Sequence, residues 1–461
     1  SVIAAARGFA ALGWETRVCT EKADHERLSP GVVVGEVGAF RPDLIVAVNY
    51  HRHHFTGLPD GVPFVCWIQD DMLHLIEPGA GGRLGARDFV MCAWAHRYFM
   101  EWGYPRERCV SVPRMVEATR GVRAGSPGAD LVYVSSHSAV PRAVLNQMVA
   151  AAGGESPGAR ATALAGERLI GIYERGGSVA TPRDLRRMLD SAARDAGVRE
   201  PDPAWLTRVT EVLSLHLNNP LYRQQGLRWA GAVARARGLS LAVYGPGWEA
   251  HPEFAPFARG TVAHGAELDA VTRAAGFNLR LEPYPATCHQ RLLEAIAAGG
   301  LVLNRRWSAW EEPEAHYAAF FLEHLAGRAS SDGEAEAMLD GASLEQWRGV
   351  TDGLCAVFPH MRSMDVTAHF AKRLSDGTMA DYVLSGHPPR FFETVFDDEA
   401  GLGALVDRFL ADPGERAAII ETQRAAVVAR FSYETGLRLL LEAVSSRVAT
   451  GAGCAACGGA A

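Results

Sequence analysis

The chain has 461 residues, 48% of them hydrophobic and 21% charged, with a formal net charge of −7. A chain of this length is too long for one ordinary hydrophobic core, and it predicts two to four domains. Positive and negative charges are interspersed along the chain, which argues against a nucleic-acid partner. The sequence has no run of about 18 apolar residues, the length that a membrane span needs. Eight irregularly spaced cysteines fit a reducing compartment. We therefore expect a cytoplasmic enzyme that acts on small molecules.

The first predicted domain covers residues 1–124. Residues 2–12 place their apolar side chains on one helical face, and a short strand is expected at 16–19. Continuous apolar runs predict strands that are buried on both faces; these runs are 42–48, 63–68, 89–92 and 109–112. Their alternation with helices indicates a parallel, Rossmann-like sheet. The strand and glycine turn that normally precede the first helix are not found, so we expect this domain to lack its first strand.

A second α/β domain is predicted for residues 125–395, with mainly helical insertions near 140–218 and 305–390. Its apolar runs again alternate with helical patterns; the predicted strands are 131–134, 239–244, 277–281 and 301–303. Residues 396–447 are predicted to form the last helices of the chain, which we call the closing helices. A Gly/Ala-rich tail, 448–461, is expected to be disordered.

The segment from Glu282 to Gly300 has the pattern of an anion site. A strand ends at Leu281, and after a polar loop Thr287 is a plausible helix N-cap. Such a loop, at the carboxyl edge of a parallel strand, presents free backbone N–H groups and the positive end of a helix dipole. Helical spacing puts Thr287, Arg291 and Glu294 on one face. The opposite, buried face is expected to hold Leu292, Leu293 and Ile296.

Two readings of Arg291 and Glu294 follow from this spacing. In the first, Arg291 pairs with a diphosphate, and Glu294 accepts hydrogen bonds from ribose hydroxyls. In the second, the two side chains form an i,i+3 surface pair worth only a few tenths of a kcal/mol. The apolar character of the rest of the helix favours the first reading.

This segment resembles the nucleotide-sugar site of GT-B glycosyltransferases of the glycosyltransferase group 1 kind. It is most similar to the spore-maturation (CgeB-type) branch, whose pattern is R-x-x-E followed by a small-residue helix end and glycine. Arg291, Glu294 and Gly299 fill those places. The turn of Gly245, Gly247 and Trp248 resembles the Gly-x-Gly-Trp turn of the family. The resemblance covers residues 220–305 and 395–445 well, and residues 1–120 loosely.

The resemblance implies two Rossmann-like domains that face each other across a cleft, with closing helices that cross back to the first domain. It implies a hexosyltransferase-like, metal-independent enzyme with a nucleotide-diphospho-sugar as co-substrate and no other cofactor. Tyr284 and His289 fall within the implied donor site. Retaining relatives carry a second glutamate where this chain has Ala286, so His289 is a candidate for its contact with the transferred sugar. Trp248 is expected either to stack near the nucleotide or to pack in the core.

Polar side chains follow two strands of the first domain. Asn49 and three histidines come after Val48, and Gln69, Asp70 and Asp71 come after Ile68. An inverting transfer needs a general base for the acceptor hydroxyl. We expect Asp70 to serve, with His53 as the second candidate. Alternatively, the aspartates cap a turn. A metal site made by the histidines is not expected, because three ligands within four residues are geometrically awkward.

The sequence therefore predicts transfer of a sugar from a nucleotide-diphospho-sugar to an unknown hydroxyl-bearing glycan, protein or metabolite. One alternative is a nucleotide-sugar epimerase or hydrolase on the same fold. Another is a non-catalytic nucleotide-sugar-binding subunit. A dehydrogenase is disfavoured because the chain lacks the dinucleotide fingerprint.

Overall fold

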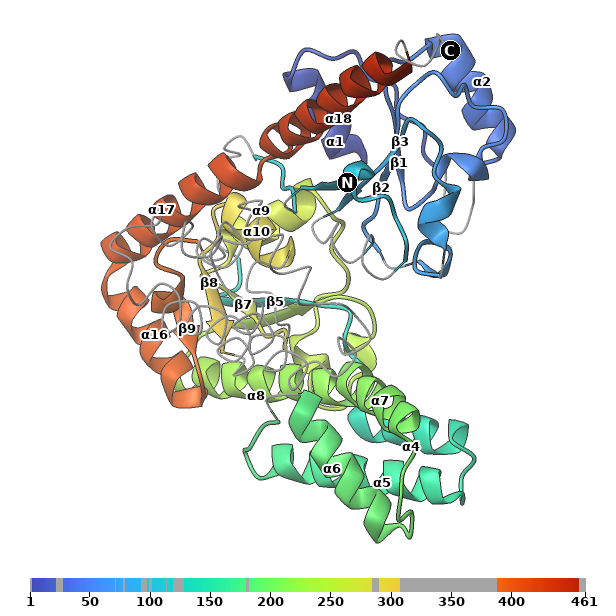
Figure 1. Cartoon of the computed structure of the whole chain (residues 1–461). Coiled ribbons are helices and arrows are strands. Elements are labelled where there is room, and N and C mark those ends of the chain that lie inside the picture. Colours follow the sequence, from blue (N-terminus) through green and yellow to red (C-terminus); the bar gives the residue numbers. More distant parts are fainter. Residues whose placement is uncertain are drawn as a thin grey trace, which may run out of the picture. The chain divides into compact units, whose positions relative to one another are not determined.

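The computed structural model describes residues 2–21, 28–70, 72–77, 79–92, 98, 102–112, 114–118, 128–179, 182–283, 290–306 and 388–455. The chain divides into two compact units. Unit 1 is Ser1–Ala118 together with Val427–Ala461, and unit 2 is Thr119–Ala426. Each unit contains a parallel sheet with helices beside it (Figure 1). The predicted class, α/β with two parallel sheets, is confirmed.

The sheet of unit 1 has the strand order β1-β2-β3-β4. Its strands are β1 (Ile45–Val48), β2 (Phe64–Trp67), β3 (Asp88–Cys92) and β4 (Cys109–Ser111). All residues of β2 and β3 are buried, as their apolar runs predict, because parallel sheets are covered on both faces. The edge strand β1 is only partly buried.

Helix α1 (Val2–Ala11) and the C-terminal helix α18 (Tyr433–Ala455) pack together in unit 1. Their close approach depends on Gly8, where a Cβ atom would lie 2.8 Å from Cβ of Tyr433 and 2.9 Å from Cδ1 of Leu437. The chain thus returns to its first unit at its C-terminal end. Helix α18 also extends to Ala455, into the stretch for which the sequence predicted disorder.

The strand predicted at residues 16–19 does not form, and this prediction is wrong. These residues have no regular structure and line a largely apolar groove of about 600 Å³ beside β1, α1 and α2 (Pro30–Phe40). A short segment forms a strand only where a neighbouring strand can accept its hydrogen bonds. Among the described residues, β1 pairs only with β2, on its other edge.

The sheet of unit 2 has the order β6-β5-β7-β8-β9. Its strands are β5 (Leu131–Val134), β6 (Leu241–Tyr244), β7 (Phe277–Arg280), β8 (Val302–Arg305) and β9 (Val395–Phe396). Helix α8 (Asn219–Arg237) lies on one side of this sheet, and α9 (Ala266–Ala274) and α10 (Gln290–Ala297) lie on the other (Figure 1). Both faces of the parallel strands are therefore covered, as their apolar character requires.

Residues 140–218 form a helical region between β5 and α8. It consists of α4 (Pro141–Ala151), α5 (Pro157–Glu174), α6 (Pro182–Asp195), α7 (Pro203–Val212) and a π-helical turn, Leu213–Asn218. The π turn leads directly into α8, where Pro220 follows. A proline inside a long helix removes one backbone donor, and a π turn is one way to accommodate that loss. The second predicted insertion, 305–390, lies almost wholly outside the described residues.

The closing helices divide between the two units. Helix α16 (Glu399–Ala411) buries Leu402, Val406 and Phe409 in the core of unit 2. Helix α17 (Pro413–Phe431) begins in unit 2 and ends in unit 1, where α18 follows. No helix within the described ranges is long and apolar enough to cross a membrane.

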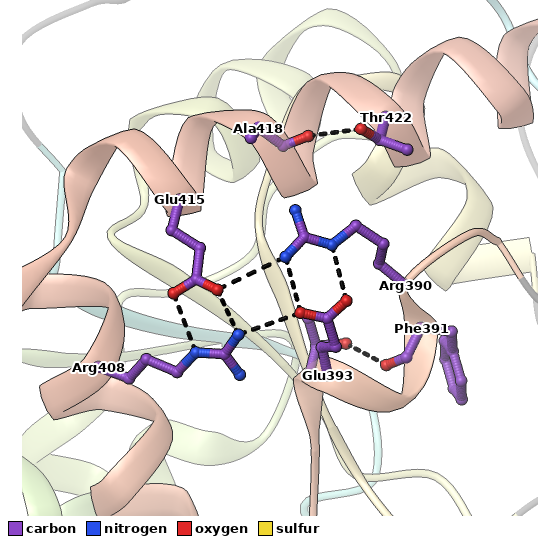
Figure 2. A network of polar contacts seen from close by, with 8 residues as sticks. Arg390, Phe391, Glu393, Arg408, Glu415, Ala418 and Thr422 are labelled. Atoms are coloured by element: carbon purple, nitrogen blue, oxygen red, sulfur yellow. Dashed lines mark hydrogen bonds and ion pairs between the residues drawn. The ribbon is translucent and has the colours of Figure 1, made fainter.

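Four charged side chains join the start of α17 to α16 and to the turn before β9 (Figure 2). Arg390 donates two hydrogen bonds of 2.7 Å to Glu393, and Arg408 donates bonds of 3.0 Å to Glu393 and Glu415. Burial is modest, with 25–38% of each side chain exposed. The network therefore restrains the first turn of α17 relative to α16 and β9.

Candidate functional site

The carboxyl ends of β5 and β7 are the expected binding edge of unit 2. After β5 the chain adds β6 on one side of that strand, and then crosses to add β7 on its other side. This reversal is the topological switch point, where open α/β sheets bind ligands. The loops that meet there begin with Ser135 after β5, Gly245 after β6 and Leu281 after β7.

A buried polar cluster lies beneath this edge. Arg223 of α8 donates to the Tyr133 hydroxyl at 3.0 Å, and its Nη1 lies 3.4 Å from Oε1 of Glu282. Nε of Arg280 lies 3.4 Å from Oε2 of the same carboxylate. These four residues are at most 4% exposed. Removing one partner of such a cluster is costly, because it leaves a buried charge without its counter-charge.

The first loop after β5 carries His137, which the sequence analysis did not identify. Nδ1 of His137 lies 3.2 Å from Oγ of Ser135. Burial, and secondly the charge of Arg223, lower the pKa of His137 to about 4, so its imidazole is neutral at pH 7. The available signal was its position, directly after the central strand of a doubly wound sheet.

Gly245 and Gly247 are explained by the contact between two loops. Gly245 has φ +132°, and a Cβ atom there would lie 2.0 Å from the Ser135 carbonyl oxygen. Gly247 has φ +83°, and its Cβ would lie 2.4 Å from Oγ of Ser138. The loop after β6 therefore lies directly against the loop after β5, and any side chain at these positions would separate them.

The expectation that Trp248 stacks near the nucleotide is not supported. The residue is 0% exposed, and its indole N–H donates to the Ser135 carbonyl oxygen at 2.6 Å. A buried ring has no face to offer a ligand. Trp248 instead packs in the core of unit 2, which was the alternative expectation. Its hydrogen bond to Ser135 restrains the start of the loop after β5.

Helix α10 has the two faces that its sequence predicts. Leu292, Leu293 and Ile296 are at most 1% exposed, whereas Arg291 and Glu294 are half-buried. Both polar side chains line a small recess of about 30 Å³, which Arg280 also lines. The helix ends before Gly299, whose φ is +87°. Arg291 and Glu294 thus border a recess between α9, α10 and the sheet.

The Glu294 carboxylate has two hydrogen-bond donors. Nε2 of Gln290 and Nε2 of His264 each lie 3.0 Å from its Oε1 atom. Burial raises the pKa of Glu294, but the hydrogen bonds from His264 and Gln290 outweigh it, so the pKa is lowered overall. The group is ionised at neutral pH. The other predicted donor-site residues, Tyr284, Thr287 and His289, lie outside the described residues.

In unit 1, Asp70 lies at the carboxyl end of β2, beside Asn49 at the end of β1. The Asn49 side chain donates to Oδ2 of Asp70 at 3.0 Å and accepts the Asp70 backbone N–H at 3.2 Å. His74, which the sequence analysis did not name, donates from Nε2 to the Asn49 carbonyl oxygen at 2.9 Å. Its position four residues after Asp70 was the only signal in the sequence.

His53 belongs to a separate part of this edge. Its ring centroid lies 4.2 Å from that of His54, which in turn lies 4.8 Å from that of His74. Burial, then the neighbouring charge of His54, lower the pKa of His53. No hydrogen bond joins His53 to Asp70 in the part of the chain that the structure describes. No three histidine, cysteine or carboxylate side chains in those ranges are arranged to hold a metal ion.

Unit 2 is thus a Rossmann-like α/β unit with polar side chains gathered at its switch point. Comparison with protein families gives the same region a chemical class. Residues 223–337, about a quarter of the chain, match the family described as glycosyl transferase-like. The match begins at Arg223 and contains Gly245, His264, Arg291 and Glu294. It supports glycosyl transfer as the general activity. No curated protein and no solved structure matches the chain.

Proposed function

We propose that this protein is a metal-independent glycosyltransferase of the GT-B type, close to the CgeB-type branch. Unit 2 binds a nucleotide-diphospho-sugar at the edge formed by the loops after β5, β6 and β7. Unit 1 binds the hydroxyl-bearing acceptor. The observation that carries the proposal is the pair Arg291 and Glu294, half-buried on α10, the helix that follows β7, in a region with glycosyl transferase-like sequence.

Each group has a defined chemical task in this proposal. Arg291 pairs with the diphosphate, where a permanently charged, planar guanidinium can form two parallel hydrogen bonds. Glu294 accepts hydrogen bonds from ribose hydroxyls. The negative charge that develops on the leaving diphosphate is stabilised by Arg291 and by backbone amides, which are fixed before the reaction begins. The chain contains no Asp-x-Asp motif for a metal ion.

In unit 1, Asp70 is the proposed general base, with His53 as second candidate. Asn49 restrains the Asp70 carboxylate through one oxygen, which leaves the other oxygen for an acceptor hydroxyl. His53 is also suited to accept a proton at neutral pH, since its lowered pKa keeps the imidazole uncharged.

The test is a thermal-shift and calorimetric panel of UDP, GDP, dTDP and CDP sugars with the wild type, Arg291→Ala and Glu294→Ala. Binding to the native state raises the melting temperature. We expect one base to bind, and each variant to lose about 10-fold to 100-fold in affinity, as for hydrogen bonds to charged groups. Unchanged affinity in both variants would remove the assignment. Product analysis with and without acceptor separates transfer from hydrolysis or epimerisation.

A further inference from the structure

His264 and Glu294 form a pair that joins two segments of unit 2. His264 lies in the loop between β6 and α9, and Glu294 lies on α10, 30 residues further along the chain. Both donors to the carboxylate, His264 and Gln290, reach the same oxygen, Oε1. In the part of the chain that the structure describes, Oε2 receives no hydrogen bond. The carboxylate is therefore held by one oxygen and presents the other.

One side chain of the pair is buried and the other is exposed to solvent. The Glu294 side chain is 16% exposed, whereas that of His264 is 67% exposed. A side chain as confined as Glu294 has few alternative rotamers, and a bond to one of its oxygens sets the direction of the other. The imidazole of His264 thus lies on the solvent side of the Glu294 carboxylate.

The loop that carries His264 is itself restrained at both ends. The Gly245 N–H donates to the Gly260 carbonyl oxygen at 2.8 Å, which ties the loop to the turn after β6. The Ala263 N–H donates to Oε2 of Glu267 at 2.8 Å, at the start of α9. These two bonds restrain the backbone that carries His264, which lowers the ordering entropy lost when its side chain contacts Glu294.

The charges around His264 favour the contact. The hydrogen bond to Glu294 raises the pKa of His264, which burial and the nearby charge of Arg291 oppose. The pKa of Glu294 shifts in the opposite direction. The charged form of each partner is therefore stabilised by the other, and the interaction is stronger than one between neutral groups.

We propose that His264 is a positioning residue that holds Oε1 of Glu294, so that Oε2 accepts a hydrogen bond from a ribose hydroxyl of the bound nucleotide. This inference rests on the proposed function. It assigns to His264 the preference for ribonucleotides over 2′-deoxyribonucleotides. His264 itself need not touch the sugar.

The experiment compares UDP with dUDP, GDP with dGDP and CDP with dCDP by calorimetry, using the full chain. The variants are His264→Ala, which removes the donor, and His264→Gln, which retains an N–H donor on a side chain of similar length. His216 lies exposed in the π turn of unit 2, so His216→Ala is the matched control. The measured quantity is the ratio of the Kd for the deoxynucleotide to the Kd for the ribonucleotide.

For the wild type we expect a ratio of about ten or more, since a site built to bond a hydroxyl rejects the analogue that lacks it. His264→Ala should lower this ratio at least threefold, while His264→Gln and His216→Ala stay within twofold of the wild type. Equal weakening of both nucleotides in His264→Ala would show a merely structural role and overturn the inference alone. A wild type that binds only dTDP would overturn the inference alone, and one that binds none of these nucleotides, dTDP included, would overturn the proposed function and the inference with it.

Discussion

Asn49 restrains Asp70 through both ends of its side-chain amide. Nδ2 of Asn49 donates to Oδ2 of Asp70 at 3.0 Å, while Oδ1 of Asn49 accepts the Asp70 backbone N–H at 3.2 Å. Asn49 adopts φ +58°, a left-handed conformation that asparagine tolerates better than most residues. A strained backbone at the end of β1 thus coincides with a fixed carboxylate at the end of β2, and such strain is often found at functional sites.

The first prediction concerns this carboxylate. Asp70→Asn preserves the size of the side chain but removes its ability to accept a proton. We expect transfer at saturating donor and acceptor to fall by about 10²–10⁴-fold, the usual contribution of a general base. The affinity for the donor nucleotide should not change. The measurement is the steady-state rate, with calorimetry of nucleotide binding beside it.

His53→Gln is the matched comparison, because His53 is the second candidate for the same role. If His53→Gln loses the transfer and Asp70→Asn keeps it within threefold, the roles are reversed and Asp70 is a turn residue. If both variants keep it, the base is neither of them.

The second prediction uses the contact between the loops after β5 and β6. In Gly245→Ala the new methyl group would meet the Ser135 carbonyl oxygen at 2.0 Å, at a backbone φ of +132°. Overpacking and left-handed strain together should cost more than about 2 kcal/mol in the free energy of unfolding. Nucleotide affinity should also fall, because the loop that carries His137 must move.

Gly238→Ala is the control that separates the effect of backbone strain from the effect of the contact between the two loops. Gly238 also has a positive φ, +66°, but nothing lies within 4 Å of the added Cβ. We expect about 1–2 kcal/mol of destabilisation in urea, with unchanged nucleotide affinity. Equal losses in the two variants would mean that the loop contact contributes nothing.

The sequence was informative wherever a property is local and periodic. The buried strands β2 and β3, and the two faces of α10, follow from runs and spacings of apolar residues. The partners of those elements are not local. His264 and Glu294 are 30 residues apart, and Trp248 reaches the Ser135 backbone across 113. Neither contact leaves a pattern in the chain, so the role of His264 and the burial of Trp248 required the fold.

The third prediction concerns pH and the ion network at α17. Hydrogen bonds from Arg390, and then from Arg408, lower the pKa of Glu393 to about 2. A carboxylate with a depressed pKa stabilises the native state above its unfolded pKa of about 4.5, and this contribution is lost as the pH falls toward 2. Because a partly exposed ion pair contributes at most about 1 kcal/mol, Glu393→Gln should melt about 1–2 °C lower than the wild type at pH 7.

The difference between Glu393→Gln and the wild type should shrink steadily from about pH 5 downward, because the unfolded chain then binds a proton at Glu393 that the native carboxylate, with its lower pKa, does not bind. Glu421→Gln, at an exposed position on α17, is the control and should track the wild type at every pH. A melting-temperature difference that stays constant between pH 7 and pH 3 would contradict the assigned role of the network. The measurement is urea or thermal unfolding across that range.

The fourth prediction tests the packing of α18 against α1 with one substitution at two places. In Gly8→Ala the new Cβ would lie 2.8 Å from Cβ of Tyr433, so one helix must shift, at a cost of about 1–3 kcal/mol in the free energy of unfolding. In Gly35→Ala, within α2, nothing lies within 4 Å of the Cβ. Alanine should stabilise that helix by about 0.5–1 kcal/mol. Urea denaturation should give opposite signs for the two variants, because helix propensity acts equally at both sites and only Gly8 faces another helix. A gain in stability at both positions would mean that α18 does not approach α1 this closely.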